Sequence, residues 1–333
     1  MSGPVMLLDS ASLYFRAYYG VPESVTAPDG SPVNAVRGLL DMIARLLTDH
    51  RPDRLVACWD EDWRPAFRVA AIPSYKAHRV VGGAEAAAAA VGGTGPAAAE
   101  EVPGTLAPQV PVIAAVLAAL GIARAGAAGF EADDVIGTLT AREVARPAAE
   151  RGPVLVVTGD RDLFQLVDDA AGVRVLYTVR GIKDIEQVDQ ARLTDRYAVP
   201  TGAAYADLAV LRGDPSDGLP GVAGIGEKTA ATLLARYGDL AGVLAARDSG
   251  DAGLTATQRR RLTEAADYLE VAPAVVRVAP DAPVELAGTP GAADPAAFRL
   301  PHEPADPEAL VDLAARWGLE SSVRRVLAAL ARR

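Results

Sequence analysis

Short apolar runs recur along the first half of the chain, and stretches with helical spacing separate most of them. Four runs have the length and composition of buried β-strands: VMLL (5–8), LVACW (55–59), VLVV (154–157) and VRVLYTV (173–179). Strands that alternate with helices are typical of parallel sheets joined by crossover helices. The pattern therefore predicts an α/β fold with a mostly parallel sheet.

Helical spacing is clearest at 34–50, where six apolar residues share one face: Val36, Leu39, Leu40, Ile43, Leu46 and Leu47. A second helix is predicted to open at Glu131. After Val179 the pattern becomes mainly helical, with predicted helices at 201–214, 226–238 and 307–330, the last one broken near Gly318. The stretch 275–305 is rich in proline, alanine and glycine, and we expect it to be irregular.

Residues 80–111 interrupt the first part with glycine, alanine and proline and contain almost no large apolar side chains. Because this composition buries little apolar surface, we expect a flexible insertion with room for one short helix over 85–90. The chain should thus contain two domains. An α/β domain spans 1–186 and includes the insertion at 80–111, and a helical domain spans 187–333.

Three of the predicted strands run directly into an acid, since Asp9, Asp60 and Asp160 follow VMLL, LVACW and VLVV. The carboxyl ends of parallel strands form the rim where ligands bind in open α/β sheets. A single aspartate there is usually a turn or helix cap. Three at the same topological position are predicted to converge on one site.

The sequence GFEADDVIGTLT, at 129–140, places Glu131, Asp133 and Asp134 at the start of a helix. Acids in a first turn complement the positive end of the helix dipole, each by about 0.3–1 kcal/mol when exposed. One or two acids serve that purpose, whereas a third adds repulsion between like charges and favours a bound cation. We expect Asp133 and Asp134 to divide between direct and water-mediated contacts with such an ion.

Two further motifs carry paired aspartates beside predicted turns. TGDRDLFQLVDD (158–169) contains Asp160 and Asp162, and GDPSDGLPG (213–221) contains Asp214 and Asp217. Helix capping and Asx turns explain each pair equally well when it is taken alone.

Nine carboxylates thus stand beside strand ends, helix starts or turns: Asp9, Asp60, Glu131, Asp133, Asp134, Asp160, Asp162, Asp214 and Asp217. Bringing them together without cations would cost ~4 kcal/mol per close pair at an effective dielectric constant of 20. Oxygen ligands without histidine or cysteine favour Mg²⁺ or Mn²⁺, bound partly through water, over Zn²⁺. The set predicts a site for two or more such ions.

A glycine-rich segment, LPGVAGIGEKTAATLLARYGDL at 219–240, has Gly221, Gly224 and Gly226 ahead of a helix that carries Lys228 near its start. Glycines let a backbone approach a phosphate closely, and the amides of a helix N-terminus bind the anion. A tight corner between two helices explains the same residues, and the local pattern does not choose between these interpretations.

The segment FRVAAIPSYKAHR, at 67–79, concentrates positive charge in an otherwise acidic chain through Arg68, Lys76 and Arg79, with Tyr75 and His78 among them. A solvated helix face is the usual explanation of such a run. Because this one follows the acid at the end of LVACW, its cations are also candidates to contact a phosphodiester during its hydrolysis.

The net charge of -10 and a pI near 4.9 argue at first against a polyanionic partner. Subtracting the nine site acids from -10 leaves -1, so the rest of the protein is nearly neutral and nucleic acid is not excluded. The single cysteine, Cys58, excludes an internal disulfide and a multi-cysteine zinc site. The N-terminus lacks the basic start of a signal peptide, and no membrane-spanning stretch of ~20 apolar residues occurs, so we expect a cytoplasmic protein.

Together these motifs resemble the 5' nuclease family, which comprises the 5'-3' exonuclease domain of bacterial DNA polymerase I and the related flap endonucleases. The matching stretches run in the family's order over about residues 5–240: LLDSASLYFRAYYG, FRVAAIPSYKAHR, GFEADDVIGTLT, VVTGDRDLFQLV and GDPSDGLPGVAGIGEKTAATLLARYG. The resemblance implies a PIN-like nuclease domain with a mostly parallel sheet. It also implies a helix-three-turn-helix at about 203–238 that holds duplex DNA through its phosphates, often with a bound K⁺ ion.

The resemblance further implies a role for each candidate residue. All nine acids fall on the family's metal-site positions, with seven in a central site and Asp214 and Asp217 in a second, product-side part. The basic residues at the foot of the family's helical arch are matched by Arg68, Lys76 and Arg79. The family's other DNA contacts are matched by Arg16, the base-stacking Tyr75, Gly224, Gly226 and Lys228.

Two features depart from the family's pattern. Gly218 follows Asp217 where the family usually has asparagine, which alters the surroundings of the acid without removing a carboxylate. The long segment at 80–111 stands where the family usually has a short proline-containing stretch beside its arch.

The implied activity is divalent-metal-dependent hydrolysis of DNA phosphodiesters, as a 5'-3' exonuclease or 5'-flap endonuclease in replication and repair. We expect a stand-alone, nucleoid-associated monomer that acts on flapped, nicked or 5'-ended duplexes and binds no membrane. Two alternatives compete with this interpretation. A nuclease-inactive DNA-junction binder on the same scaffold would have lost metal ligands, and a small-molecule phosphatase would leave the glycine-rich turn and the basic segment unexplained.

Overall fold

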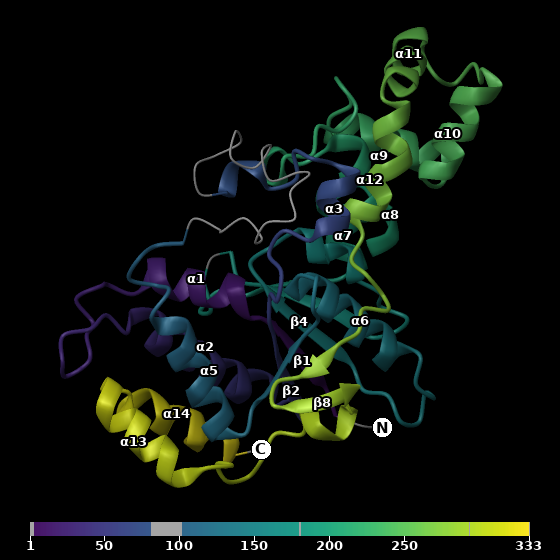
Figure 1. Ribbon diagram of the computed structural model, residues 1–333. Coiled ribbons are helices and arrows are strands. Elements are labelled where there is room, and N and C mark those ends of the chain that lie inside the picture. Colours follow the sequence, from purple (N-terminus) through teal and green to yellow (C-terminus); the bar gives the residue numbers. More distant parts are fainter. Residues whose placement is uncertain (1–2, 81–101, 180, 293, 333) are drawn as a thin grey trace.

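A central sheet with helices on both faces organises the protein (Figure 1). The computed structural model describes residues 3–80, 102–179, 181–292 and 294–332, so the short helix expected at 85–90 lies outside the described residues. Within them the strand order is β6-β5-β4-β1-β2-β3-β7-β8. The strands are β1 (Val5–Asp9), β2 (Arg54–Cys58), β3 (Ala123–Gly126), β4 (Val154–Thr158), β5 (Val173–Tyr177), β6 (Glu186–Val188), β7 (Glu285–Leu286) and β8 (Thr289–Ala292).

The five inner strands, β5, β4, β1, β2 and β3, are parallel, and the outer pairings are antiparallel. All four strands predicted from the apolar runs are present, and the predicted α/β fold with a mostly parallel sheet is confirmed. Because β4, β1 and β2 are neighbours with one direction, their carboxyl ends meet at the same edge of the sheet.

The run VMLL is apolar throughout because both faces of β1 are covered. Met6 and Leu8 join a core formed with α1 (Ser10–Gly20), α2 (Asn34–His50) and α5 (Gln109–Leu120). Val5 and Leu7 point to the other face, into a core shared with α6 (Ala132–Val144). Side chains alternate between the faces of a strand, so burial on both sides removes the polar positions from the sequence.

The helical part lies beyond one end of the sheet, at the upper right of Figure 1. The predicted helices at 201–214 and 226–238 correspond to α8 (Gly202–Arg212) and α9 (Glu227–Tyr237). The core of α6 continues without a break into this part through Tyr205 and Leu234. The short helix α3 (Ala66–Ala71) packs beside α12. The helical part comprises α7 (Gln190–Tyr197), α8 (Gly202–Arg212), α9 (Glu227–Tyr237), α10 (Leu240–Ser249), α11 (Ala256–Glu264) and α12 (Ala266–Val276).

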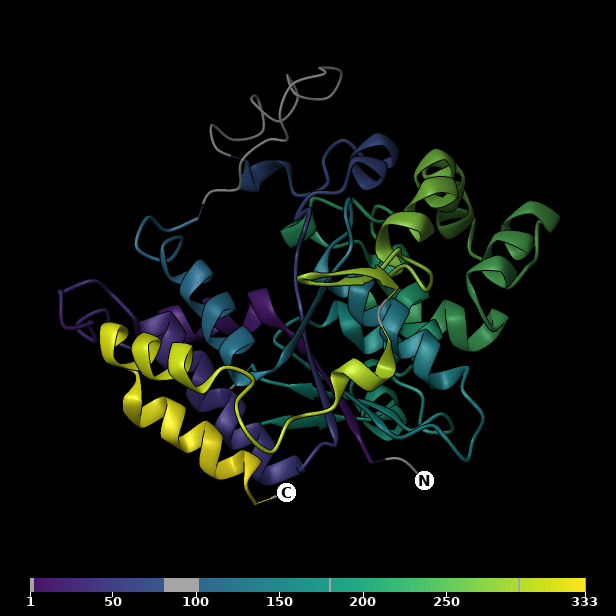
Figure 2. The same cartoon turned by 60° about the horizontal axis from the view of Figure 1, so that its bottom comes forward.

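The last two helices, α13 (Pro307–Trp317) and α14 (Glu320–Leu330), are separated at Gly318 as predicted, but they do not join the helical part. They pack on α2 and α5, on the opposite side of the sheet from α6 (Figures 1 and 2). Val326 is fully buried in the same core as Leu39 of α2. The assignment of all residues from 187 to 333 to one helical domain is therefore corrected, because the apolar faces of α13 and α14 complete the core around α2.

The stretch 275–305, which we expected to be irregular, contains more structure than its composition indicates. Strands β7 and β8 form an antiparallel pair at the edge of the sheet beside β3. A 3₁₀ turn, η4 (Pro295–Phe298), follows them. Two short antiparallel strands need little apolar sequence of their own when an existing sheet edge supplies the partner. No helix among the described residues is long and apolar enough to cross a membrane.

Replacing Leu319 by alanine tests whether α13 and α14 belong to the central core. Leu319 is fully buried between the two helices, so Leu319→Ala should lower the free energy of unfolding by about 2–5 kcal/mol, measured by denaturant titration. The control is Val311→Ala on α13, where the side chain is 66% exposed and the expected change is within about 0.5 kcal/mol. Equal, small effects of both changes would show that these helices contribute little to the fold.

Candidate active site

Acidic side chains from three neighbouring strands meet in one cavity at the carboxyl edge of the sheet. Asp9 is the last residue of β1, and Asp60 and Asp160 follow β2 and β4 by two residues. These three carboxylates line a cavity of about 380 Å³ together with Glu131 and Asp133 from the start of α6. The prediction that the strand-end acids converge is therefore met for Asp9, Asp60 and Asp160.

The same acids also cap local structure, so the two interpretations of the sequence are compatible. Asp9 accepts a hydrogen bond from the backbone N–H of Ser12 at 3.1 Å, in the first turn of α1. Asp60 accepts one from the N–H of Ala132 at 2.7 Å, at the start of α6. Asp160 accepts one from the N–H of Asp162 at 2.9 Å. Each cap holds its carboxylate in place and leaves further lone pairs directed at the cavity.

The cavity is costly for negative charge. Burial, followed by the charges of Asp60 and Asp160, raises the pKa of Asp9 from 3.8 to about 7, although hydrogen bonds from Thr158 and Ser12 oppose this shift. Burial and the charge of Asp9 likewise raise the pKa of Asp133 well above its usual range. The acids are therefore held closer together than their charges favour, as expected where a cation binds.

The carboxylates do not form a closed set of direct ligands. Among the described residues, no three acidic, histidine or cysteine side chains are arranged to hold an ion by themselves. An all-oxygen set that leaves room for water is the arrangement that Mg²⁺ uses, since this ion usually keeps several of its waters. The donor chemistry of the cavity therefore fits a hydrated, hard divalent cation.

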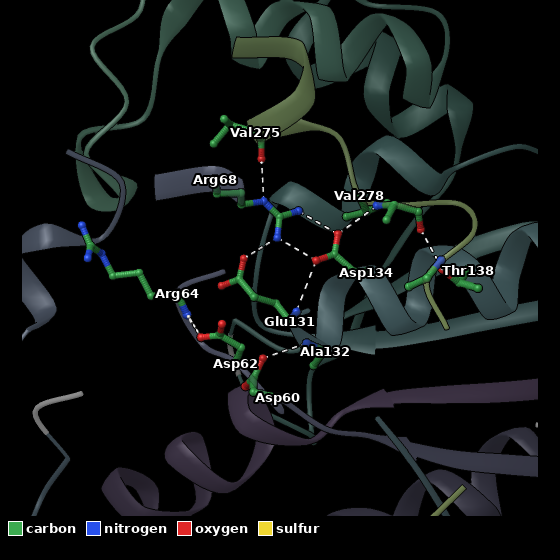
Figure 3. A network of polar contacts seen from close by, with 12 residues as sticks. Asp60, Asp62, Arg64, Arg68, Glu131, Ala132, Asp134, Thr138, Val275 and Val278 are labelled. Atoms are coloured by element: carbon green, nitrogen blue, oxygen red, sulfur yellow. Dashed lines mark hydrogen bonds and ion pairs between the residues drawn. The ribbon is translucent and has the colours of Figure 1, made fainter. Parts of the chain in front are cut away.

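Arg68 and Asp134 form a buried ion pair behind the cavity (Figure 3). The Arg68 guanidinium donates to both Asp134 oxygens at 2.7 Å, to Glu131 Oε2 at 2.7 Å and to the carbonyl of Val275 at 3.0 Å. Asp134 also accepts from the N–H of Ala279 at 2.8 Å. Both oxygens of Asp134 are thus occupied, and neither Arg68 nor Asp134 lines the cavity.

Tyr75 and Lys76 belong to this network through Glu131. The Tyr75 hydroxyl donates to Glu131 Oε2 at 2.6 Å, and the tyrosine is only 4% exposed. The Lys76 ammonium pairs with Glu131 Oε1 and lies on the cavity wall. Tyr75 is therefore buried where the family resemblance implies base stacking, whereas Lys76 lines the cavity.

A second acidic group adjoins the first. Asp162 is the first residue of η2 (Asp162–Leu166). Asp214 directly precedes the turn η3 (Pro215–Asp217), which follows α8, and Asp217 is its last residue. None of these three lines the cavity, but Asp214 and Asp217 contribute to the raised pKa of Asp160 after its desolvation and therefore lie near it. Asp162 was predicted in the central part, with Asp214 and Asp217 in the second; here it lies outside the cavity lining, as they do.

The basic segment is docked on this second acidic turn. The Arg79 guanidinium donates to Asp217 Oδ1 at 2.7 Å and to the carbonyl of Ser216 at 3.1 Å. Gly218 has a φ of +72°, and a Cβ atom there would lie 2.1 Å from the carbonyl oxygen of Ser74. Glycine in place of the family's usual asparagine therefore lets the segment around Ser74 approach the turn closely.

Arg16 stands behind the loop that carries Asp160. Its Nη1 donates to the carbonyl of Val179 at 3.1 Å, and a Cβ atom at Gly159 would lie 2.7 Å from its Nη2. Two further residues that were not predicted hold the acids in place: the Thr158 hydroxyl donates to Asp9 Oδ2 at 2.6 Å, and the Ser12 hydroxyl accepts from the Gly159 N–H at 2.8 Å. The sequence signal that could have identified them is their position near the strand-end acids, since Ser12 follows Asp9 and Thr158 precedes Asp160.

The glycine-rich turn lies in the helical part, outside the cavity lining. Gly221 and Gly224 have φ values of +64° and +70°, and Gly226 is the N-cap of α9 without a side-chain hydrogen bond to the helix. Lys228 is exposed in the first turn of α9. The turn has the open backbone amides that a phosphate needs, beside a cation.

Two family models match successive parts of the chain. Residues 4–198 match the family model described as 5'-3' exonuclease, N-terminal resolvase-like domain. Residues 200–295 match the model described as 5'-3' exonuclease, C-terminal SAM fold.

The chain belongs to the 5'-3' exonuclease family. It is 65% identical to a 5'-3' exonuclease of Streptomyces coelicolor, with 98% of this chain and 99% of that protein covered. It is 52% identical to a 5'-3' exonuclease of Mycobacterium tuberculosis, with coverage of 99% and 98%. DNA polymerase I of the same species is 41% identical over 71% of this chain and 23% of the polymerase. The predicted family and the prediction of a nuclease are confirmed.

Solved structures of lower identity share the fold. A complex of the bacteriophage T5 flap endonuclease with DNA and metal ions has a TM-score of 0.60 at 16% identity and covers 99% of this chain and 100% of that chain. The catalytic core of Rad2 in complex with a DNA substrate has a TM-score of 0.53 at 18% identity, with coverage of 98% and 93%. These similarities confirm the two-part architecture of a PIN-like domain and a helical domain.

The role of Arg68 can be tested by stability. Arg68→Met leaves Asp134 buried without its cation and removes one of the two cations that contact Glu131, so the free energy of unfolding should fall by about 3–5 kcal/mol. Arg64→Met is the control, because among the described residues the Arg64 side chain donates only to the carbonyls of Tyr75 and Pro73, and it is partly exposed. If Arg68→Met abolished cleavage at unchanged stability, Arg68 would instead be a phosphate contact.

The raised pKa of Asp9 predicts how the metal-free protein responds to pH. The folded protein holds a proton on Asp9 up to about pH 7, whereas the unfolded chain releases it near 3.8, so the free energy of unfolding falls as pH rises through this interval. Asp9→Asn should therefore stabilise the metal-free protein at pH 8 by on the order of 1–3 kcal/mol, with a smaller effect at pH 4.5. The measurement is denaturant unfolding with a chelator at both pH values. A less stable variant at pH 8 would contradict the prediction.

Proposed function

We propose that this protein is a structure-specific 5' nuclease that hydrolyses DNA phosphodiesters with divalent metal ions, as a 5'-3' exonuclease and a 5'-flap endonuclease in replication and repair. The observation that carries this proposal is the cavity in which Asp9, Asp60, Asp133 and Asp160 meet beside Lys76. Burial raises the pKa values of Asp9, Asp133 and Asp160, and a cation is the simplest source of compensation.

Mg²⁺ or Mn²⁺ is the proposed cofactor, with two or more ions held by the acids of the cavity and by Asp162, Asp214 and Asp217. Bound ions of this kind lower the pKa of a coordinated water and stabilise the leaving oxygen of a phosphodiester. Asp134 is reassigned from a metal ligand to the partner of Arg68, because both of its oxygens are engaged. The donor set contains no nitrogen or sulfur ligand, which disfavours Zn²⁺.

Lys76 and Arg79 are the proposed contacts to the reacting phosphate. Lys76 lies on the cavity wall with its ammonium on Glu131, and Arg79 lines the same cavity with one nitrogen on Asp217. Positive charge held in place before the reaction stabilises charge that develops on phosphate oxygens. Arg68 and Tyr75 are positioning residues in this proposal, because both hold Glu131 from behind.

The glycine-rich turn at 221–228 is the proposed contact to the downstream duplex. Its amides, Gly224, Gly226 and Lys228 would bind phosphates without reading base sequence, with a K⁺ ion beside the turn. Arg16 is proposed to contact the DNA near the loop of Asp160. The protein is proposed to work as a monomer in the cytoplasm, at the nucleoid.

Removing one rim carboxylate tests the proposal. Asp160→Asn should lower Mg²⁺-dependent cleavage of a labelled 5'-flap duplex by about 100-fold or more, while binding of the same DNA in a chelator persists. The control is Asp169→Asn in the same segment, an exposed aspartate outside the cavity, which should cleave normally. Near-normal cleavage by Asp160→Asn would refute the site.

Substrate form separates the proposed activity from its competitors. Flapped, nicked and blunt duplexes with Mg²⁺ or Mn²⁺ should be cut in a structure-dependent way. Binding without cutting would identify a junction-binding protein on this scaffold. Turnover of a small phosphate monoester that does not depend on duplex length would identify a phosphatase.

A further inference from the structure

The turn that precedes α9 presents a difficulty for phosphate binding. Gly224 is exposed with a φ of +70°, and its carbonyl oxygen carries partial negative charge beside the amides proposed to bind the anion. A negative dipole at that place repels a phosphate unless a cation covers it.

Arg261 of α11 covers this carbonyl. Its Nη1 donates to the Gly224 oxygen at 3.1 Å across 37 residues of sequence. A Cβ atom at position 224 would lie 1.9 Å from the same nitrogen, so the guanidinium rests directly on the turn. The φ of +70° favours glycine at this position, and the absence of a side chain lets the Arg261 guanidinium rest on the turn.

The remaining donors of Arg261 are available. Among the described residues Arg261 has no carboxylate partner, whereas its neighbour Arg260 pairs with Glu264 at 3.7 Å. A guanidinium has five N–H donors, and the single hydrogen bond to Gly224 leaves the others free to bind a phosphate.

The acid in the first turn of α9 is already paired with a cation. Glu227, in the first turn of α9, is paired with Arg212 at 3.2 Å. Lys228 follows it and is exposed. The start of α9 therefore combines first-turn amides with two cations that have no carboxylate partner among the described residues, Lys228 and Arg261, and its acid Glu227 is paired with Arg212.

We propose that Arg261 is a further DNA-binding residue, which covers the Gly224 carbonyl and contacts a backbone phosphate of the duplex beside the glycine-rich turn. This rests on the proposed function of the turn and extends it to α11. A contact of this type is independent of base sequence and releases about one counterion from the DNA.

The test is duplex affinity in a chelator, measured by fluorescence anisotropy over a salt titration. Arg261→Gln should weaken binding about tenfold and reduce the salt slope by about one. Arg261→Lys should retain the slope, because it keeps the charge. The matched control is Arg260→Gln on the same helix, 68% exposed at its side chain, which should change affinity less than about twofold.

Cleavage kinetics provide a second measurement. With a long downstream duplex, Arg261→Gln should raise KM and leave kcat unchanged, since Arg261 lies away from the cavity. An unchanged salt slope for Arg261→Gln, or equal weakening by Arg260→Gln, would overturn the proposal. Failure of the unsubstituted protein to bind any duplex would instead refute the proposed function of the turn, so the two failures are distinguishable.

Discussion

Repulsion among carboxylates is the constraint around which this protein is built. The parallel arrangement of β4, β1 and β2 delivers Asp9, Asp60 and Asp160 to one edge, where burial and then the charges of the other two acids raise the pKa of Asp9. These side chains lie beside strand ends and helix starts, and each carboxylate is held in place by a hydrogen bond that it accepts from a backbone N–H group. Burying these charged side chains lowers the free energy of unfolding of the metal-free protein, and a bound cation would offset that loss.

One buried cation of the protein, Arg68, lies behind that site and does not line the cavity. Arg68 satisfies Asp134 and Glu131 from behind, and the same guanidinium reaches the carbonyl of Val275 in α12. One buried group therefore joins α3, α6 and the last helix of the helical part. Through this link, the part proposed to hold DNA is fixed relative to the edge of the sheet where cleavage would occur.

The sequence predicted the strands and the edge well because both depend on local patterns. Runs such as VMLL are apolar at every position only when both faces of a strand are covered, and an acid directly after such a run has few possible locations. The three acids of GFEADDVIGTLT were harder to separate. Glu131 and Asp133 line the cavity while Asp134 faces Arg68, and helical spacing alone does not reveal which side a distant arginine will occupy.

Long-range packing was the main source of error. The family resemblance implies that Tyr75 stacks on a base, yet its hydroxyl donates to Glu131 at the start of α6 and the side chain is buried. Likewise, the amphipathic pattern of α13 and α14 establishes that they need an apolar partner without identifying α2 as that partner. Such choices depend on the shapes of surfaces that form only after the elements assemble.

The return of α13 and α14 to α2 has a consequence for folding. Leu39 and Val326 share one core although they stand near opposite ends of the described sequence, so this core consists of contacts with high contact order. A chain still in synthesis leaves the apolar face of α2 uncovered until α14 has emerged. The half of the molecule that supports β1 is therefore the last to become complete, and a partly made chain lacks a finished framework for its acids.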